Sequence, residues 1–489
     1  MAAVHGLSLR ELLAGIVPGP LPALTPRGLA ADSRRVRPGD LFFALRGRQY
    51  DGRQYLAAAA AAGAVAALVD GEVPPPDAPL PCVAVADLRQ RMGGIASRFH
   101  GHPSRALHLA AVTGTNGKTT VSQLLAQLVR ACGYDCGVIG TLGAGLDGGV
   151  SGALHTTPDA LELQATLAGW ARAAVPFVSL EASSHALDQG RLGGVEVDTA
   201  VFTNLSRDHL DYHGDMASYG AAKARLFALP GLRTAVLNAD DAFGATLAAS
   251  LPPGVGCLRY ALRAGDAELL LSGLKCDERG LRARLHSPWG SAPLRCSLLG
   301  TFNAANLAAA LAAALSAGLP FDEVVAAAAS LRPVPGRLQP LRYPGSPLVV
   351  IDYAHTPDAL AQVLAALRAP LRGRLILVFG CGGERDRGKR AAMARAATAG
   401  ADFSIVTSDN PRREDPLGII ADIEAGMHGE YRVEVDRAAA IAAALRMAGP
   451  GDCVLIAGKG HEDYQLVGGR RLPFSDLECA RRLLEERAA

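Results

Sequence analysis

A glycine- and threonine-rich turn is the feature that most narrows the folds open to this chain. The turn is Thr113–Thr120, with the sequence TGTNGKTT; it follows the apolar run His108–Val112 and opens a helical pattern from Thr119 to about Cys132. A strand, a glycine-rich turn and a helix in this order present backbone N–H groups and the positive end of a helix dipole to phosphate. The turn therefore predicts a parallel α/β layer with a nucleotide at its edge.

Two side chains of this turn have the chemistry that a nucleoside triphosphate needs. Lys118 is placed to neutralise the β- and γ-phosphates, and the Thr119 hydroxyl to bind the accompanying Mg²⁺. The strict phosphate-loop pattern asks for glycine where Val112 stands, although Gly114 still supplies a flexible turn. The alternative is a glycine-rich turn that binds no ligand.

The same alternation of apolar runs and Ala/Leu-rich helical patterns extends along nearly all 489 residues. It predicts an α/β protein with parallel sheets, and this length suggests two to four domains at roughly 100–200 residues each. We expect three domains, over residues 1–107, 108–333 and 334–489. The third begins near Pro333–Arg337, and its expected strands are Leu348–Ile351, Leu375–Phe379, Phe403–Val406 and Val454–Ala457.

Composition excludes several classes of protein. A net charge of +2 without a basic block argues against a nucleic-acid partner. The Ala-rich runs are too short or too interrupted to span a membrane, and the N-terminus does not have the pattern of a signal peptide. Nine scattered cysteines without a CxxC pair favour free thiols in a reducing compartment. We therefore expect a cytoplasmic protein, and a monomer.

Polar residues stand at the ends of the expected strands of the second block. Glu181 follows one apolar run, Thr203-Asn204 follows another, and Asn238 a third. Ligands of open parallel sheets bind at the carboxyl ends of strands, so these residues are expected to border the nucleotide site. Glu181 is placed to hold Mg²⁺ opposite the phosphate loop; the alternative is a glutamate that caps a helix or forms an ion pair.

The segment Ser206–His213 concentrates metal-binding and proton-transferring side chains. Two histidines and two aspartates within six residues are unusual for a surface loop, although a single histidine such as His209 is as often structural. Lys223 lies in a helical stretch, Tyr219–Leu229. Its residue type alone predicts an exposed lysine.

Three charged turns follow strands of the third block: 380–390, Asp409–Arg412 and 458–463. The second offers a carboxylate, an amide and a guanidinium, which suits a zwitterionic ligand, because Arg pairs bidentately with a carboxylate and Asp with an ammonium. Any one of these turns, taken alone, is equally consistent with an ordinary polar loop between a strand and a helix. Cys381 has no histidine nearby in sequence, so we interpret it as a packing residue.

Taken together, these motifs resemble those of the Mur ligases of peptidoglycan synthesis. The resemblance extends from Asp32-Ser33-Arg34 to Gly458–Glu462. Thr113–Thr120 alone would indicate only the broad group of Mur and folylpolyglutamate ligases. Three further segments are similar to those of the UDP-N-acetylmuramoyl-tripeptide synthetases in the family: Glu181–His185, Asn204–His213 and Asp352–Pro357.

The resemblance implies an N-terminal domain for a UDP moiety, a central ATPase domain and a C-terminal Rossmann-like domain for an incoming amino acid. It implies ATP as co-substrate, Mg²⁺ as cofactor, and a reaction that joins an amine to the D-glutamate side carboxylate of UDP-MurNAc-L-Ala-D-Glu through an acyl phosphate. The form Asp-Asn-Pro-Arg resembles the members that add meso-diaminopimelate, because Arg412 can pair with the distal carboxylate that lysine lacks.

The resemblance also implies roles for particular residues. The residues expected to bind ATP are Gly114, Thr115, Asn116, Gly117, Lys118, Thr119, Thr120, Asn303, Arg337 and Asp352. Those expected to bind the UDP-MurNAc-dipeptide are Ser33, Gln49, Thr156, Thr157, Ser183, Gln189 and Arg191. Those expected to bind diaminopimelate are Arg385, Asp409, Asn410, Pro411, Arg412, Gly458 and Glu462.

Four residues are expected to carry the chemistry: Lys118, Glu181, His209 and Lys223. The resemblance implies Mg²⁺ ligation by Thr119, Glu181, His209 and Lys223, with Lys223 carrying a carbamate (N6-carboxylysine) that turns a cation into a metal-binding anion. The nearest alternative is a sister ligase that adds L-lysine or a dipeptide. A phosphate-loop switch or binding module without ligation, and a purely structural protein, are alternatives from other classes.

Overall fold

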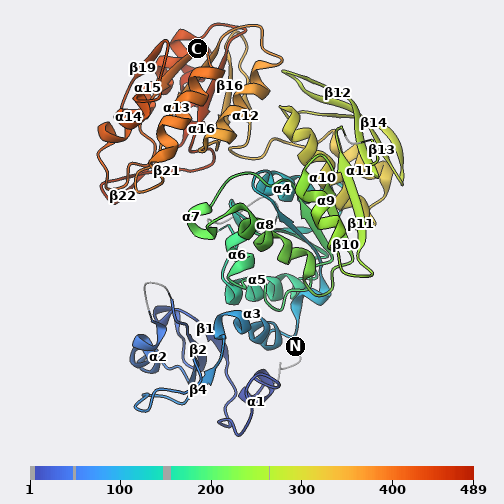
Figure 1. Ribbon diagram of the computed structural model, residues 1–489, viewed down its shortest axis with the longest axis vertical. Coiled ribbons are helices and arrows are strands. Elements are labelled where there is room, and N and C mark those ends of the chain that lie inside the picture. The colour runs from blue at the N-terminus through green and yellow to red at the C-terminus, as the bar shows by residue number, and fades with distance from the viewer. Residues whose placement is uncertain (1–5, 48–50, 147–155, 264, 489) are drawn as a thin grey trace. The chain divides into compact units, whose positions relative to one another are not determined.

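The computed structural model describes residues 6–47, 51–146, 156–263 and 265–488 (Figure 1). Contacts between residues divide the chain into two compact units, Met1–Arg259 with Ala312–Leu319, and Tyr260–Leu311 with Pro320–Ala489. Parallel sheets combined with helices confirm the predicted α/β class. The expected domain limits at 107 and 333 stay a prediction.

The first unit begins with a four-stranded parallel sheet in the order β1-β2-β3-β4. Alternate residues of β2 pack on opposite faces, with Leu41 and Phe43 in one hydrophobic cluster and Phe42 and Ala44 in another. Helices therefore cover both faces of this sheet. Its elements are α1 Leu9–Leu12, β1 Gly28–Ala30, β2 Asp40–Ala44, α2 Leu56–Ala61, β3 Ala66–Asp70, β4 Cys82–Val85 and α3 Leu88–Phe99, with 3₁₀ turns η1 Ser33–Arg35, η2 Gly52–Tyr55 and η3 Pro103–Ala106.

A second sheet of this unit holds the phosphate loop, with strand order β11-β10-β9-β5-β8-β6-β7. The pairs β10–β9, β9–β5, β5–β8 and β8–β6 are parallel, and β7 is antiparallel to β6. Its strands are β5 His108–Thr113, β6 Cys136–Gly140, β7 Gly143–Gly145, β8 Phe177–Glu181, β9 Thr199–Phe202, β10 Thr234–Asn238 and β11 Gly256–Ala261. Its helices are α4 Lys118–Ala131, α5 Ala160–Arg172, α6 Ser184–Asp188, α7 Leu210–His213, α8 Met216–Ala224 and α9 Ala242–Ala249, with the 3₁₀ turn η4 Arg225–Ala228.

The second unit starts with an antiparallel arrangement that the sequence did not predict. Strands β12, β13 and β14 form consecutive antiparallel pairs beside β11, which continues into this unit. Along much of each of these strands, more buried residues alternate with more exposed ones, as expected for strands that are covered on one face. The elements are β12 Leu269–Asp277, β13 Gly280–Ser287, β14 Gly290–Cys296, α10 Thr301–Ser316 and α11 Phe321–Ala328.

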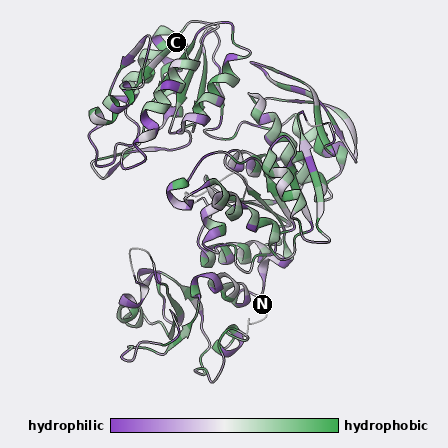
Figure 2. Cartoon of the chain, in the orientation of Figure 1, coloured by the Kyte–Doolittle hydropathy of each residue, from purple (hydrophilic) through white to green (hydrophobic). Residues whose placement is uncertain are grey.

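A six-stranded sheet completes the second unit, in the order β15-β16-β20-β17-β18-β19. It is parallel except for β15, and two separate hydrophobic clusters cover its faces. Figure 2 shows hydrophobic residues along these strands. The elements are β15 Gln339–Leu341, β16 Leu348–Asp352, α12 Pro357–Arg368, β17 Leu375–Phe379, α13 Gly388–Gly400, β18 Phe403–Val406, α14 Pro416–Glu424, β19 Tyr431–Val433, α15 Arg437–Met447, β20 Cys453–Ala457, β21 Tyr464–Val467, β22 Arg470–Pro473 and α16 Asp476–Ala488.

Two broader expectations can be compared with the fold. All nine cysteines are free thiols, as their spacing predicted. Within the described ranges, no helix has the length and apolar character that crossing a bilayer requires.

Candidate functional site

The phosphate-loop turn depends on two glycines with left-handed backbone angles. Gly114 has φ +148° and Gly117, at the N-terminus of α4, has φ +88°. A Cβ at Gly114 would lie 1.9 Å from Oγ1 of Thr203, so this position excludes every larger residue. Val112, which breaks the strict pattern, is fully buried in β5 beside β8 and β9. Gly114 therefore supplies the left-handed turn after β5, and Val112 belongs to the buried strand that precedes it.

The predicted rim residues Thr203 and Asn204 hold the loop in place. Oδ1 of Asn204 accepts a 2.9 Å hydrogen bond from the backbone N–H of Asn116, and the carbonyl of Asn204 accepts one of 2.8 Å from Thr115. The Thr203 hydroxyl and the Asn204 amide both donate to the carbonyl of Asn116, at 2.6 and 3.1 Å. The end of β9 therefore fixes the conformation of the loop.

Glu181, at the end of β8, faces the first turn of α4. Its side chain is 1% exposed, and its Oε2 accepts a 2.9 Å hydrogen bond from the hydroxyl of Thr119. The backbone N–H of Thr141 donates to Oε1 at 2.7 Å, and the Thr141 hydroxyl to Oε2 at 3.1 Å. The structure thus brings together two of the four residues predicted to bind magnesium, Thr119 and Glu181.

Sequence reasoning missed two residues that shape the position of Glu181. Thr141 donates to both of its carboxylate oxygens, and Gly140 lies directly against it. A Cβ at Gly140 would come within 2.0 Å of Oε1 of Glu181. A glycine and a polar residue at the end of a strand-like run, 136–141, were the only signal in the sequence.

Lys223 is buried, contrary to the exposure that its residue type predicted. It is 1% exposed on α8, and its Nζ donates a 2.7 Å hydrogen bond to the carbonyl of Gly114. Nζ also lies 4.2 Å from the centre of the Tyr219 ring. Burial, together with the charge of Lys118, lowers the pKa of Lys223 well below its ordinary value. A neutral amine at the phosphate loop has the reactivity that a carbamate requires.

Lys118 and His209 lie on the same side of the loop as Lys223. Lys118 Nζ donates to the carbonyls of Gly114 and Thr115 at 2.9 Å each. Burial lowers the pKa of His209; the carboxylate of Asp208, 3.4 Å away, opposes this, and the charges of Lys118 and Lys223 act with it. A neutral imidazole is the form that binds metal or accepts a proton.

The residues expected to hold the MurNAc-dipeptide form a network beside Glu181. Thr157 Oγ1 donates to the backbone carbonyl of Glu181 at 2.7 Å and lies 3.4 Å from the hydroxyl of Ser183. Arg191 donates to the carbonyl of Thr157 at 2.7 Å and to Oε1 of Gln189 at 2.8 Å. These residues therefore form one hydrogen-bonded network, with Thr157 buried at its centre.

The remaining residues expected to contact the UDP-MurNAc-dipeptide differ in how much the structure describes. The Thr156 hydroxyl lies 3.1 Å from that of Thr141, which places Thr156 beside Glu181. Ser33 begins the turn η1 next to the first sheet. Gln49 lies outside the described residues.

Three residues expected near the nucleoside lie in the second unit. Asn303 is buried on α10, donates to the carbonyl of Leu299 at 2.8 Å and accepts from Asn306 at 3.0 Å. The guanidinium of Arg337 stacks 4.5 Å from the centre of the Tyr353 ring. Asp352 accepts backbone hydrogen bonds from Leu338 and Ala354, both 2.7 Å, and burial raises its pKa.

Two of the charged turns meet at the carboxyl ends of β18 and β20. The Asn410 amide donates to Oε2 of Glu462 at 2.8 Å, and a Cβ at Gly458 would lie 2.8 Å from Oδ2 of Asp409. Lys459 lies between the turns, with Nζ 3.0 Å from Oε2 of Glu462 and 3.8 Å from Oδ1 of Asp409. The predicted pocket residues are therefore assembled around a lysine that the sequence did not single out.

Arg412 and Arg385 border this pocket. Arg412 has the left-handed φ of +56°, uncommon for a residue with a side chain, and donates to the carbonyl of Gly383 at 2.6 Å. A Cβ at Gly382 would lie 3.0 Å from Arg412 Nη1 and 3.9 Å from Arg385 Cγ. The carbonyl of Pro411 packs against Gly383. The structure therefore brings Arg412 and Arg385 together at Gly382, in the turn that follows β17.

Cys381 is a packing residue, as its sequence surroundings indicated. It is 3% exposed, its Sγ lies 3.6 Å from Sδ of Met393, and burial raises the pKa of its thiol to about 12. A thiol with so high a pKa is not a nucleophile at neutral pH.

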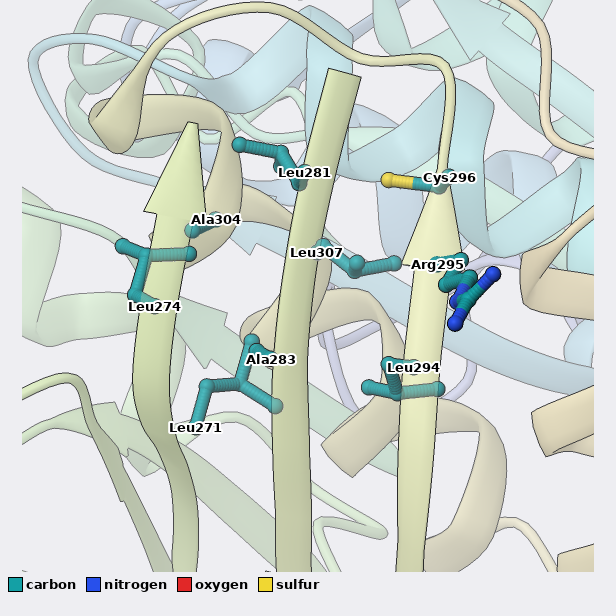
Figure 3. A pocket seen from close by; sticks show the side chains of 9 residues that line it. All are labelled: Leu271, Leu274, Leu281, Ala283, Leu294, Arg295, Cys296, Ala304 and Leu307. Carbon is teal, nitrogen blue, oxygen red and sulfur yellow. The ribbon is translucent and has the colours of Figure 1, made fainter. Parts of the chain in front are cut away.

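Two cavities lie away from these residues. The first, in the core of the antiparallel strands, is a void of about 10 Å³ lined mainly by leucine and alanine, and Figure 3 shows Leu281, Ala304 and Leu307 around it. It is too small for a ligand larger than one water molecule. The second, about 390 Å³, is an open depression beside His100 and Arg172. The chemistry of the strand-end residues therefore locates the candidate site better than cavity size does.

The residues at the phosphate loop fit a magnesium ion that keeps most of its ligands from phosphate and water. Within the described part of the chain, no three His, Cys, Asp or Glu side chains converge as a complete metal site. Mg²⁺ is usually held by one or two carboxylates together with substrate phosphates. The buried carboxylate of Glu181, with the Thr119 hydroxyl 2.9 Å away, provides that kind of partial site.

Comparisons with known proteins agree over nearly the whole chain. Three family models match: "Mur ligase family, catalytic domain" over residues 26–100, "Mur ligase middle domain" over 112–314, and "Mur ligase, glutamate ligase domain" over 336–460. The UDP-N-acetylmuramoyl-L-alanyl-D-glutamate--2,6-diaminopimelate ligase of Alkalilimnicola ehrlichii is 52% identical over 471 residues, covering 94% of this chain and 95% of that protein. The ligase of the same name from Ectopseudomonas mendocina is 50% identical, covering 94% and 97%.

A solved structure shows the same likeness in three dimensions. It is a UDP-N-acetylmuramoyl-L-alanyl-D-glutamate--2,6-diaminopimelate ligase, 40% identical, with a TM-score of 0.74. The match covers 99% of this chain and all of that one.

Proposed function

This chain belongs to the Mur ligase family, and on that premise we propose that it ligates meso-2,6-diaminopimelate to the D-glutamate side carboxylate of UDP-MurNAc-L-Ala-D-Glu, using ATP. The reaction supplies a peptidoglycan precursor. The observation that carries the choice of amino acid is the Asp409–Arg412 turn, where Asn410 is joined to Glu462 at 2.8 Å and Arg412 stands at the edge of the pocket. Carboxylates suit the distal ammonium of diaminopimelate, and Arg412 its distal carboxylate.

ATP activates the carboxylate and the amine completes the amide bond. The D-glutamate carboxylate attacks the γ-phosphorus, ADP leaves, and an acyl phosphate forms. The amine nitrogen then attacks the acyl carbon, the tetrahedral intermediate expels inorganic phosphate, and the ammonium proton passes to solvent or to a base. Mg²⁺, when bound at Glu181 and Thr119, neutralises phosphate charge.

The residues of the chain contribute binding and orientation. Lys118 and the N–H groups of the loop stabilise charge on the transferring phosphoryl group, and Thr203 and Asn204 fix the loop that presents them. The polar network around Thr157 and Arg191 orients the dipeptide carboxylate toward the loop. A carbamate on Lys223 would add a negative charge next to the bound Mg²⁺. We further propose that the protein acts in the cytoplasm, where cysteines without disulfides stay reduced. We also propose that it acts as a monomer.

An ADP-release assay tests this function. The purified protein is given ATP, Mg²⁺ and UDP-MurNAc-L-Ala-D-Glu, with meso-diaminopimelate, L-lysine or D-alanyl-D-alanine as the amine. We expect ADP only when the UDP-dipeptide and meso-diaminopimelate are both present. Equal release with L-lysine overturns the argument from Arg412, and release without any amino acid overturns ligation itself.

A further inference from the structure

We propose that Lys459 is a positioning residue of the amino-acid pocket. Its buried ammonium orients Asn410 and Glu462. It also leaves the floor of the pocket, formed by Asp409, Glu462 and Lys459, with one net negative charge. This inference rests on the proposed function and goes beyond it, because it assigns a role to a residue outside the expected set of ligand contacts.

Lys459 connects the two turns that build the pocket. It lies two residues after the end of β20 and is 0% exposed. Its Nζ donates to Oδ1 of Asn410 at 3.2 Å and to Oε2 of Glu462 at 3.0 Å. Both acceptors therefore depend on the same buried cation, although they are 52 residues apart in sequence.

The amide of Asn410 is oriented by this arrangement. Its Oδ1 accepts from Lys459 and, at 2.9 Å, from the backbone N–H of Leu466 on β21, while its Nδ2 donates to Glu462. On the same strand, Gln465 donates to the backbone carbonyl of Asp409 at 2.8 Å. Removal of the ammonium would take one donor from Asn410 and one from Glu462 at once. Strand β21 would still hold the backbone of the turn at Asp409 and Asn410. The substitution should therefore disturb only the orientation of the two side chains.

A count of buried charges gives Lys459 its second role. Asp409 and Glu462 supply two negative charges at the floor, and Lys459 supplies one positive charge between them. The other buried cation nearby, Arg437, is paired with Asp476 at 2.7 Å, and both side chains are 0% exposed. The floor therefore retains a net charge of −1, which the ammonium group of one substrate molecule would neutralise. With Arg412 for the carboxylate, the pocket matches one zwitterionic centre.

The test compares steady-state constants of Lys459→Met, Glu462→Gln, the double variant Lys459→Met/Glu462→Gln and the exposed control Lys275→Met with those of the unmodified protein. We expect Lys459→Met to raise KM for meso-diaminopimelate about tenfold or more, with KM for ATP and for the UDP-dipeptide within about twofold. The double variant also lacks the carboxylate that faces the substrate ammonium. Because Lys459 acts partly through Glu462, adding Glu462→Gln to Lys459→Met should raise KM by less than Glu462→Gln raises it in the unmodified protein. Lys275→Met should behave as the unmodified protein.

Each other outcome has a defined meaning. An unchanged KM for diaminopimelate, or a parallel change in all three KM values, overturns the role of Lys459. If Glu462→Gln raises KM by the same factor with and without Lys459, Lys459 does not act through Glu462 and that part of the proposal is wrong. Thermal unfolding of Lys459→Met and Lys459→Gln is measured alongside; if neither variant folds, Lys459 stabilises the fold and the proposal is wrong. If the unmodified protein releases no ADP with diaminopimelate, the proposed function has failed instead, and the inference falls with it.

Discussion

The side-chain nitrogen of Lys223 lies 2.7 Å from the carbonyl oxygen of Gly114, so a lysine from α8 contacts the phosphate loop directly. The contact is buried, and burial with the charge of Lys118 lowers the pKa of Lys223. Only the neutral form of an amine adds to carbon dioxide. The lowered pKa increases the share of the neutral amine, which is the form that the proposed carbamate on Lys223 would require.

Replacement of Lys223 by alanine should reduce the rate of ADP release by about 100-fold or more. It removes the proposed carbamate, a charged group next to the phosphoryl group that is transferred. Acetate or propionate should partly restore activity by occupying the vacated space with a carboxylate. The exposed Lys275, replaced in the same way, serves as control. Full activity of Lys223→Ala without added acid would refute the carbamate role.

Gly140→Ala should displace Glu181, because the added Cβ would meet its Oε1 at 2.0 Å. We expect the Mg²⁺ concentration for half-maximal activity to rise about 10- to 100-fold, the usual effect of disturbing a residue that supports a metal ligand. Gly169→Ala, in helix α5 with no atom near the added group, is the matched control. An unaltered Mg²⁺ requirement in Gly140→Ala would remove Glu181 from the metal site.

The sequence predicted the parallel strands closely. Leu375–Phe379 and Phe403–Val406 are the observed limits of β17 and β18, because buried parallel strands are uninterrupted apolar runs that end in polar turns. The same logic placed Glu181, Asn204 and Asp409 at strand ends. These residues were accessible to sequence reasoning because a strand end is a local feature.

Features that depend on distant contacts were not accessible in this way. The burial of Lys223 depends on α8 meeting a loop 109 residues away, and that of Lys459 on Asn410, 49 residues away. Strands β12–β14 are half-exposed and carry polar residues. They therefore lack the uninterrupted apolar run by which the sequence revealed the parallel strands, and their antiparallel pairing was not predicted.

Arg412→Lys should raise KM for meso-diaminopimelate about 10- to 100-fold while KM for ATP stays constant. Lysine keeps the charge but loses the planar fork that pairs with a carboxylate. The neighbouring Arg413 is exposed, and Arg413→Lys controls for the loss of a guanidinium near the pocket. If the two variants have the same KM, Arg412 does not recognise the distal carboxylate.

Asp476→Asn should destabilise the protein by about 3–5 kcal/mol, because it leaves the fully buried guanidinium of Arg437 without its ion-pair partner. Urea unfolding measures the free energy. The exposed pair of Glu478 and Arg481 provides the contrast, since Glu478→Gln should cost less than about 1 kcal/mol. Similar costs for the two substitutions would mean that Arg437 finds another partner.

Glu414 should make stability depend on pH in the acid range. Hydrogen bonds from the backbone N–H of Glu384 and from the guanidinium groups of Arg390 and Arg387 lower the pKa of Glu414 from 4.5 to about 2. A lowered folded-state pKa means that the ionised form stabilises the fold above pH 4.5, and that this contribution disappears as the pH falls from 4.5 toward 2.

Urea unfolding at pH 6, 4.5 and 3.5 tests this effect with Glu414→Gln and, as control, the exposed Glu323→Gln at the start of α11. We expect Glu414→Gln to be less stable than the unmodified protein at pH 6 and to lose less stability between pH 4.5 and 3.5, because its amide does not titrate. The control should follow the unmodified protein at each pH. Parallel pH profiles for Glu414→Gln and the unmodified protein would show that ionised Glu414 does not stabilise the fold through Glu384, Arg387 and Arg390.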